Sequence, residues 1–247
     1  MRGGYQKVVR SVVDTACARQ TGSVLEVGCG SGAVARWLVG YLPLDKPLTA
    51  VDVNSYLLHE AASLAAVAGL DDRLSFQVGD AEALPFASES FDVTLSFTVM
   101  EEVDADRMLA EMVRVTRPGG RIGVVVRAID QPRFLNVALS PELEARVLGM
   151  SAPRLGVGSH GCADVSLYRR FVDAGLADLE MGPQLASDNP EQSARVLPEY
   201  ADRIAHALPA DDARQFRDAV AGAVRDRILI FAQPYHCAVG VRAKGRS

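Results

Sequence analysis

The stretch with the clearest capacity for chemistry places one acid and three glycines at every second position: Glu26, Gly28, Gly30 and Gly32. An apolar run at 24–27 precedes the glycines, and apolar residues at helical spacing follow them, so the pattern predicts a strand, a tight turn and a helix. Glycine permits positive φ and close approach of the backbone to a ligand, and a helix start offers unpaired N–H groups. The segment therefore predicts a turn that binds a cofactor.

A second candidate is the carboxylate of Asp52, at the end of the next predicted strand (48–53). A carboxylate there can accept hydrogen bonds from both hydroxyls of a ribose, as it does in dinucleotide sites. Taken by itself, Asp52 could also be a simple turn acid, and Asn54 beside it is placed to cap the following helix. The register of Asp52 with the glycine turn favours the ribose role.

Strands that alternate with helices position these residues. The pattern predicts strands at 24–27, 48–53, 74–78, 91–97, 121–126, 176–181 and 228–243. Val93, Leu95 and Phe97 mix with small residues, as is typical of a strand covered on both faces. Ligands of open α/β sheets bind at the carboxyl ends of the strands, so we expect Ser96 to lie near the ligand.

Four segments together resemble the class I S-adenosylmethionine (SAM) dependent methyltransferases, in the manner of small-molecule methyltransferases of type 11. They are the glycine turn with its acid, the G-D-A-E-A-L-P-F segment at 79–86, the R-P-G-G-R segment at 117–121, and D-A-G-L at 173–176. The resemblance covers roughly residues 8–126 and 164–182 and the final strand. It implies a Rossmann-like sheet of seven mostly parallel strands, the last antiparallel, with helices on both faces and a helical or loop lid.

The resemblance also implies which residues bind SAM. The glycine turn lies beside the methionine moiety, and Glu26 orders that loop and the amino group. Asp80 accepts from the adenine amine, the N–H of Ala81 serves a ring nitrogen, and Leu84 and Phe86 wall the ring; an Asx-type turn is the structural alternative at Asp80. The expected cofactor residues are Glu26, Gly28, Gly30, Gly32, Asp52, Val53, Asp80, Ala81 and Ser96.

Methyl transfer needs a base only when the acceptor carries a proton. The candidate bases are Glu101, Glu102, His160 and His236, of which we favour Glu101 and His160 as catalytic residues. The family often has histidine where this chain has Glu102, and both glutamates could simply favour a helix start. His160 could be an exposed loop residue, and His236 a core residue. The four histidines share no ligand spacing, so we expect no metal site.

The composition narrows the class of protein. The chain has 247 residues, of which 49% are hydrophobic, enough for one large α/β domain. The net charge of −5 and the lack of a basic run argue against nucleic acid or an anionic membrane surface as a partner. Four cysteines without C-x-x-C pairing, no secretory leader and no long apolar run favour the cytoplasm. A homodimer and a monomer both stay open.

Two insertions interrupt the resemblance, at about 127–163 and 184–227, within a single domain spanning 1–247. The first is apolar, with a short helix expected at 141–148, and connections of this length are usually lids or binding loops. The second has helical patterns at 194–208, interrupted near Pro198, and at 210–227. We expect the first insertion to help cover the substrate.

The hypothesis is a SAM-dependent methyltransferase that acts on an oxygen, nitrogen or carbon atom of a small molecule, secondary-metabolite intermediates included. Two alternatives stay open. One is a protein of the same fold that binds SAM as a cyclase or a regulator. The other is an NAD-dependent oxidoreductase, against which the spacing of Gly28, Gly30 and Gly32 argues, because dinucleotide sites use G-x-G-x-x-G.

Overall fold

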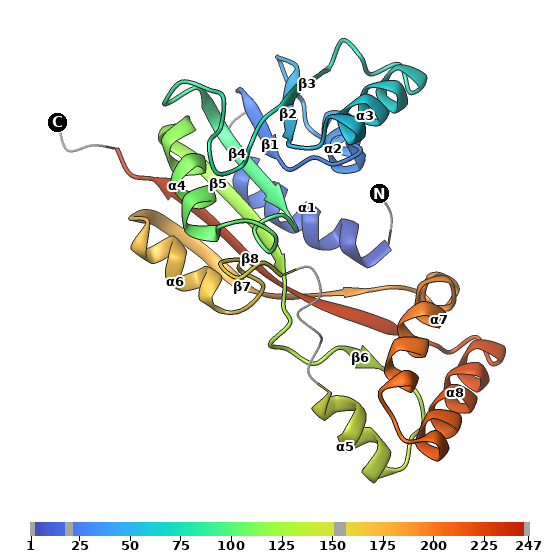
Figure 1. Cartoon of the computed structure of the whole chain (residues 1–247). Helices are drawn as coiled ribbons and strands as arrows, with labels where there is room; N and C mark the ends of the chain where they lie inside the picture. The colour runs from blue at the N-terminus through green and yellow to red at the C-terminus, as the bar shows by residue number, and fades with distance from the viewer. Residues whose placement is uncertain (1–2, 18–21, 151–156, 245–247) are drawn as a thin grey trace.

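The computed structural model describes residues 3–17, 22–150 and 157–244, and its centre is a mixed sheet of eight strands (Figure 1). Strands β3, β2, β1, β4 and β5 run parallel in that order, and β8 lies antiparallel between β5 and β7. The strands are β1 (Val24–Val27), β2 (Leu48–Asp52), β3 (Leu74–Val78), β4 (Phe91–Phe97), β5 (Thr116–Arg127), β6 (Phe134–Leu135), β7 (Leu176–Ser187) and β8 (Phe231–Arg242).

This arrangement confirms the Rossmann-like α/β class, with two differences in detail. The sheet has eight strands rather than seven, because β6, inside the first insertion, pairs with Ala232 and Phe231 at the start of β8. The strand expected at 176–181 continues to Ser187, because β7 stays paired with β8 over that length. The antiparallel final strand was predicted correctly.

Helices cover both faces of the sheet, since alternate residues of a buried strand point to opposite faces. On one face, α1, α2 and α3 pack over side chains such as Leu95 and Val125. On the other face, α4 and α6 pack over Leu25 and Val124. The helices are α1 (Gly3–Cys17), α2 (Ala33–Tyr41), α3 (Ser55–Val67), α4 (Ala105–Val115), α5 (Pro141–Gly149), α6 (Ser166–Asp173), α7 (Pro190–His206) and α8 (Ala210–Arg225).

Two helix starts near the carboxyl edge of the sheet are fixed by their own caps. The Asn54 side chain accepts from the backbone N–H groups of Tyr56 and Leu57, which confirms the predicted cap of α3. Asp104 does the same for Asp106 and Arg107 at the start of α4. These caps fix where the loops after β2 and β4 end, and both loops border the cavity described below.

The two insertions come together as one helical lobe, which we define as α5, β6, α7 and α8. Its apolar faces form a third core that is separate from the two faces of the sheet, with Phe216 and Leu143 at its centre. Figure 1 shows this lobe beyond the end of the long β7–β8 ribbon, away from α2 and α3. The two insertions therefore stabilise each other.

The predicted helix at 141–148 is confirmed as α5. The expected interruption near Pro198 is wrong, because α7 runs unbroken from Pro190 to His206. Residues 151–156 of the first insertion lie outside the described residues. Among the described helices, none combines the length and apolarity that a membrane span requires. The division into a single domain with two lid insertions stays a prediction.

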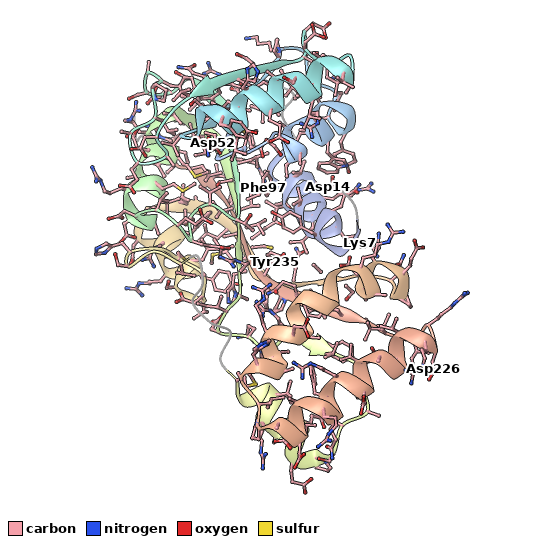
Figure 2. All side chains as sticks on the ribbon, turned by 45° about the vertical axis from the view of Figure 1, so that its right-hand side comes forward. Lys7, Asp14, Asp52, Phe97, Asp226 and Tyr235 are labelled. Atoms are coloured by element: carbon pink, nitrogen blue, oxygen red, sulfur yellow. The ribbon has the colours of Figure 1, made fainter. Side chains whose placement is uncertain are left out.

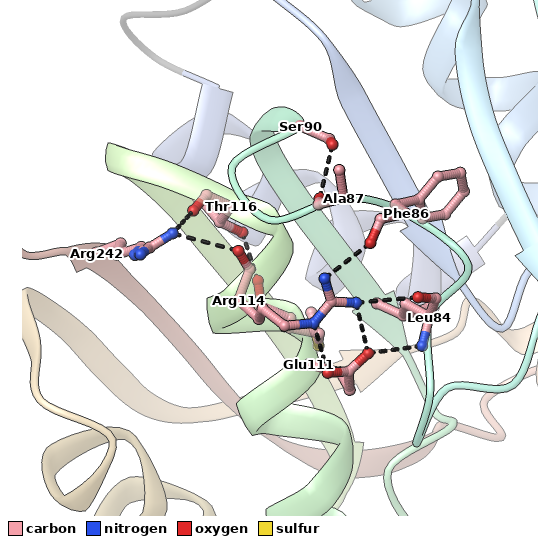
Figure 3. A network of polar contacts seen from close by, with 9 residues as sticks. Leu84, Phe86, Ala87, Ser90, Glu111, Arg114, Thr116 and Arg242 are labelled. Carbon is pink, nitrogen blue, oxygen red and sulfur yellow. Dashed lines mark hydrogen bonds and ion pairs between the residues drawn. The ribbon is translucent and has the colours of Figure 1, made fainter.

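A network on α4 fixes the loop at 84–86, as Figure 3 shows. The Arg114 guanidinium donates to the carbonyl oxygens of Phe86 at 2.7 Å and Leu84 at 3.0 Å, and it pairs with Glu111. Glu111 in turn accepts from the Leu84 N–H at 2.7 Å. The loop is therefore held on α4 by hydrogen bonds to its backbone, which do not depend on the identity of its side chains.

We predict that Arg114→Leu lowers the free energy of unfolding by about 1–2 kcal/mol, because two carbonyls and Glu111 lose their charged donor. Urea unfolding monitored by circular dichroism measures the change. The control is Arg107→Leu, which removes an exposed ion pair with Glu82 and should cost under about 1 kcal/mol. Equal losses in the two variants would contradict the special role of Arg114.

Candidate cofactor and substrate cavity

A cavity of about 560 Å³ lies at the carboxyl ends of β1 to β4. Its wall includes Tyr5 of α1, Asp52 after β2, Asp80 after β3 and Phe97 of β4, of which Figure 2 labels Asp52 and Phe97. Open parallel sheets bind ligands at this edge, and small-molecule sites typically enclose about 300–1,000 Å³. Position and size therefore both suit a ligand of cofactor dimensions.

The glycine turn takes the conformation that its residue types predict. Gly28, Gly30 and Gly32 have φ of 76°, 51° and 70°. A Cβ on Gly28 would lie 2.2 Å from a methyl of Val99, so that position excludes any side chain. A Cβ on Gly30 would have no heavy atom within 4 Å, so its backbone is left accessible to a ligand in the cavity.

Asp52 holds the glycine turn in place. Its Oδ2 accepts from Gly30 N at 2.7 Å, and its Oδ1 accepts from Asn54 N at 2.9 Å. Each carboxylate oxygen has a second lone pair, so both can still accept from a ligand hydroxyl. Val53 lines the cavity beside it.

Glu26 is the least satisfied polar group of the cavity. It is 2% exposed, and no described residue gives its Oε2 a hydrogen bond. Burial and the neighbouring Asp52 raise the pKa of Glu26 to about 8, against the opposing effect of Arg36. A buried carboxyl with a free oxygen is suited to a ligand that brings a donor or a positive charge.

The loop after β3 keeps part of its expected arrangement. Asp80 and Ala81 line the cavity, and Asp80 Oδ1 accepts from Glu82 N at 2.8 Å, so the Asx-type turn is present as well. Leu84 and Phe86 do not wall the cavity, which corrects our expectation. Leu84 is in the core under α4, and Phe86 packs beside it, because the network in Figure 3 turns this loop toward α4.

Two further expected cofactor residues lie outside the cavity wall. The Ser96 hydroxyl donates to Val27 O at 3.0 Å and is fully buried between β4 and β1. Gly32 faces the interior instead, where an added Cβ would meet Ala61 at 3.1 Å and Phe76 at 3.2 Å. Both residues support the turn from behind.

The two favoured catalytic residues are not on the cavity wall either. Glu101 is 1% exposed, and its carboxylate accepts from both the backbone N–H and the guanidinium of Arg127. Burial raises the pKa of Glu101 even so. His160 is exposed, and its carbonyl oxygen accepts from Ala105 N at 3.1 Å. The segment with His160 therefore packs on the start of α4 through its backbone.

The neighbouring Glu102, one of the candidate bases, does line the cavity, and so do Thr98 and Tyr5. Thr98 has φ of 59°, an uncommon and strained conformation for a β-branched residue. Its hydroxyl donates to Phe97 O at 2.7 Å and lies 3.5 Å from the Tyr5 hydroxyl. The amphipathic pattern of α1 was the available signal for Tyr5.

His236, the other histidine considered as a base, belongs to a separate group. Its Nδ1 lies 2.8 Å from the Tyr168 hydroxyl, and its Nε2 lies 2.7 Å from Asp130 Oδ1. It is 2% exposed and does not line the cavity, so the interpretation as a satisfied core residue fits the structure. Among the described residues, no cluster of three or more His, Cys, Asp or Glu side chains could hold a metal ion.

Comparisons with known proteins agree on one family. Residues 25–124 match the family model described as "Methyltransferase domain". A ubiquinone/menaquinone biosynthesis C-methyltransferase from Geotalea daltonii is 34% identical over 115 residues, which cover 46% of this chain and 48% of that protein. The aligned segment spans half or less of the length of the curated relatives that the chain matches.

Solved structures extend the similarity of fold to nearly the whole chain. The YcgJ protein of Bacillus subtilis superposes with a TM-score of 0.61 at 20% identity, covering 98% of this chain and all of that one. Phosphoethanolamine N-methyltransferase 2 of Haemonchus contortus, solved with S-adenosyl-L-methionine, gives 0.60 at 18% identity over 96% of this chain and 53% of that one. At such identities the likeness concerns the fold alone.

We predict that Glu26→Gln stabilises the ligand-free protein, and more so as the pH rises. The folded-state pKa near 8 exceeds the usual value of 4.5, so the folded state binds the proton more tightly and stability declines between those pH values. Glutamine does not titrate. Thermal unfolding at pH 5 to 9 should show a gain in Tm that grows to at least about 2 °C.

The control is Glu142→Gln, at an exposed carboxyl in the first turn of α5. A Tm difference for Glu26→Gln that does not grow with pH relative to this control would mean that Glu26 is ionised in the free protein.

Proposed function

The segment at 25–124 is a class I, SAM-dependent methyltransferase domain, and on that premise we propose that this protein transfers the methyl group of SAM to an oxygen, nitrogen or carbon atom of a small molecule. One observation carries the proposal. A single cavity collects polar groups from the ends of three neighbouring strands, Glu26 with the glycine turn, Asp52 and Asp80. The three strands are neighbours in the sheet, and we assign these groups to the methionine, ribose and adenine parts of SAM in the order β1, β2 and β3.

Two features of the cavity fit the methionine end of SAM. The free Oε2 of Glu26 accepts from the amino group, whose positive charge compensates the buried carboxylate. The open space over Gly30 leaves room for the ligand to lie against the backbone. Both features would be liabilities in a turn with a purely structural role, because an unsatisfied buried acceptor costs stability.

The other residues suit the nucleoside end. Asp52 accepts from the ribose hydroxyls with the lone pairs that Gly30 and Asn54 leave unused. Asp80 and the backbone of Ala81 serve the adenine, with Val53 and Leu57 as apolar neighbours. Gly32 and Ser96 take supporting roles in this assignment, because neither lies on the wall.

SAM, when bound, supplies an activated methyl group on a positively charged sulfur. The chain has to hold the acceptor in line with that group and to exclude water. Tyr5, Phe97, Thr98 and Val99 border the cavity on the side of β4 and α1, and we assign the acceptor to this side. Its mixture of apolar and hydroxyl groups suits a small, partly hydrophobic molecule.

We assign proton removal, where the acceptor needs it, to Glu102 rather than to Glu101 or His160. Glu102 lines the cavity and is exposed, whereas Arg127 occupies the carboxylate of Glu101. An acceptor without a removable proton needs only to be positioned, and methyl transfer to it requires no catalytic base. In this proposal the helical lobe covers the acceptor once the acceptor is bound, although no described residue of the lobe lines the cavity.

Titration calorimetry with SAM, S-adenosylhomocysteine and NAD side by side tests the cofactor. We predict micromolar binding of the two sulfur nucleotides and none of NAD. Asp52→Ala and Asp80→Ala should each weaken SAM binding by about 1–3 kcal/mol, since a buried polar group of the ligand loses its partner. Binding of NAD alone would overturn the proposal. SAM binding without S-adenosylhomocysteine formation across a broad panel of acceptors would favour a cyclase or a regulator.

A glycine pair tests the cavity itself. Gly30→Ala and Gly69→Ala both place a Cβ in open space at positive φ, 51° and 64°, so each should cost a similar 1–2 kcal/mol or so of stability. Of these two glycines, only Gly30 lines the cavity. We predict that Gly30→Ala weakens SAM binding at least about tenfold and that Gly69→Ala leaves it unchanged. Equal affinities in the two variants would exclude the glycine turn as the SAM site.

A further inference from the structure

Among the described residues, the helix that carries Tyr5 begins without a cap from its own first turn. Gly3 and Gly4, the first two described residues of α1, have no side chain that could accept from the N–H groups of that turn. An unsatisfied helix start frays unless another part of the protein supplies the acceptor. The position of Tyr5, in that first turn, therefore depends on an external contact.

Asp188, directly after β7, supplies that contact. Its Oδ1 accepts from Gly4 N at 2.8 Å, and a Cβ on Gly3 would lie 2.4 Å from the same oxygen. A carboxylate at this end of a helix also interacts favourably with the helix dipole. Asp188 thus caps α1 across 184 positions of sequence.

The backbone beside Asp188 packs directly on the same turn. A Cβ on Gly4 would lie 2.4 Å from Ser187 N and 2.5 Å from the Ala186 carbonyl carbon. The first turn of α1 therefore packs directly against the C-terminal end of β7. Both views agree with this arrangement, since the N-terminal end of α1 points toward α7 in Figure 1, and Lys7 lies toward α7 in Figure 2.

Asp188 is at the same time part of the junction with the helical lobe. Its N–H donates to Phe231 O at 3.2 Å, at the start of β8. Its carbonyl oxygen accepts from the Ser193 hydroxyl in α7, and that hydroxyl also accepts from Phe231 N at 3.0 Å. The cap of α1 is thereby fixed to the lobe by hydrogen bonds in both directions.

Tyr5 connects the first turn of α1 to the cavity. Its ring lies 5.2 Å from that of Tyr235, and its hydroxyl reaches the strained Thr98 at the end of β4. Burial raises the pKa of Tyr5 to about 12. Because the Thr98 hydroxyl donates its own proton to Phe97 O, its oxygen is left to accept from the phenol. A shift of the first turn of α1 would move this phenol along the acceptor side of the cavity.

We infer that Asp188 is a positioning residue, which holds Tyr5 in place on the acceptor side of the cavity by capping α1 from the lobe junction. The inference rests on the proposed function for the role of that cavity. It connects the lobe to the site through one carboxylate, although no described residue of α5, α7 or α8 lines the cavity.

The test uses the full chain with Asp188→Ala, Asp188→Asn, Tyr5→Phe and the double variant Asp188→Ala/Tyr5→Phe. Hydrogen exchange of the amides at 4–9 should become at least about tenfold faster in Asp188→Ala, because the helix start loses its acceptor. Asp188→Asn should restore slow exchange, since the amide oxygen also caps a helix.

Activity distinguishes positioning from a purely structural role. With any acceptor that the enzyme methylates, Asp188→Ala should lower kcat at least about fivefold and change the KM for SAM less than twofold. The double variant should be no slower than the slower single variant, because both changes remove the same placement of Tyr5. Asp188→Asn should recover most of kcat.

The matched control is Gln184→Ala, which breaks another hydrogen bond between β7 and α1, from Gln184 to the Ser11 hydroxyl at 2.6 Å. This variant should leave exchange at 4–9 and kcat unchanged. Unchanged exchange in Asp188→Ala, or effects on kcat that add in full with Tyr5→Phe, would overturn the inference. A wild-type protein that binds neither SAM nor S-adenosylhomocysteine would overturn the proposed function, and exchange would still decide whether Asp188 holds α1.

Discussion

The hydrogen bonds that the end of β2 offers to the glycine turn are the constraint on which the site depends. Gly28 N and Cys29 N both donate to Val51 O, at 2.8 and 2.9 Å, and Gly30 N donates to the side chain of Asp52. Buried amides need such partners, and although Gly32 N bonds within the turn, to Cys29 O at 2.8 Å, the amides at 28–30 find theirs on β2. The register of β1 against β2 therefore sets the shape of the cavity.

The same contacts bring two carboxyl groups together at the cavity floor. Burial disfavours the charged form of Glu26, and the nearby charge of Asp52 adds to that effect. Arg36 compensates only in part, since its guanidinium donates to Ser31 O at 2.6 Å. A ligand with a positive group would lower the cost of ionising Glu26 in this site. The ligand-free site therefore favours positively charged ligands.

Local patterns predicted much of this fold. The glycine turn, the cap at Asn54 and the buried strands depend on neighbouring residues, and a single sequence shows those directly. Two features depend on distant partners and were missed. The loop after β4 turns at the positive φ of Thr98, so Glu101 meets Arg127 instead of the cavity. The network of Arg114 turns Leu84 away from the site.

The lobe shows the same limit at a larger scale. Each insertion displayed amphipathic helices, which indicate an unpaired apolar face but not its partner. The two faces cover each other, so the lobe forms from segments about 40 residues apart, each marginal by itself. Both insertions have helices with an apolar face and no obvious partner, and this was the signal that could have suggested the lobe.

The central place of β8 bears on how the chain folds during synthesis. This strand lies between β5 and β7 and also pairs with β6, yet it is the last of the eight strands in sequence order. Until it is made, the valine-rich edge of β5 at Val124 to Val126 is unpaired, and open apolar edges invite association with other chains. The sheet should therefore be most open to such association before β8 has been synthesised.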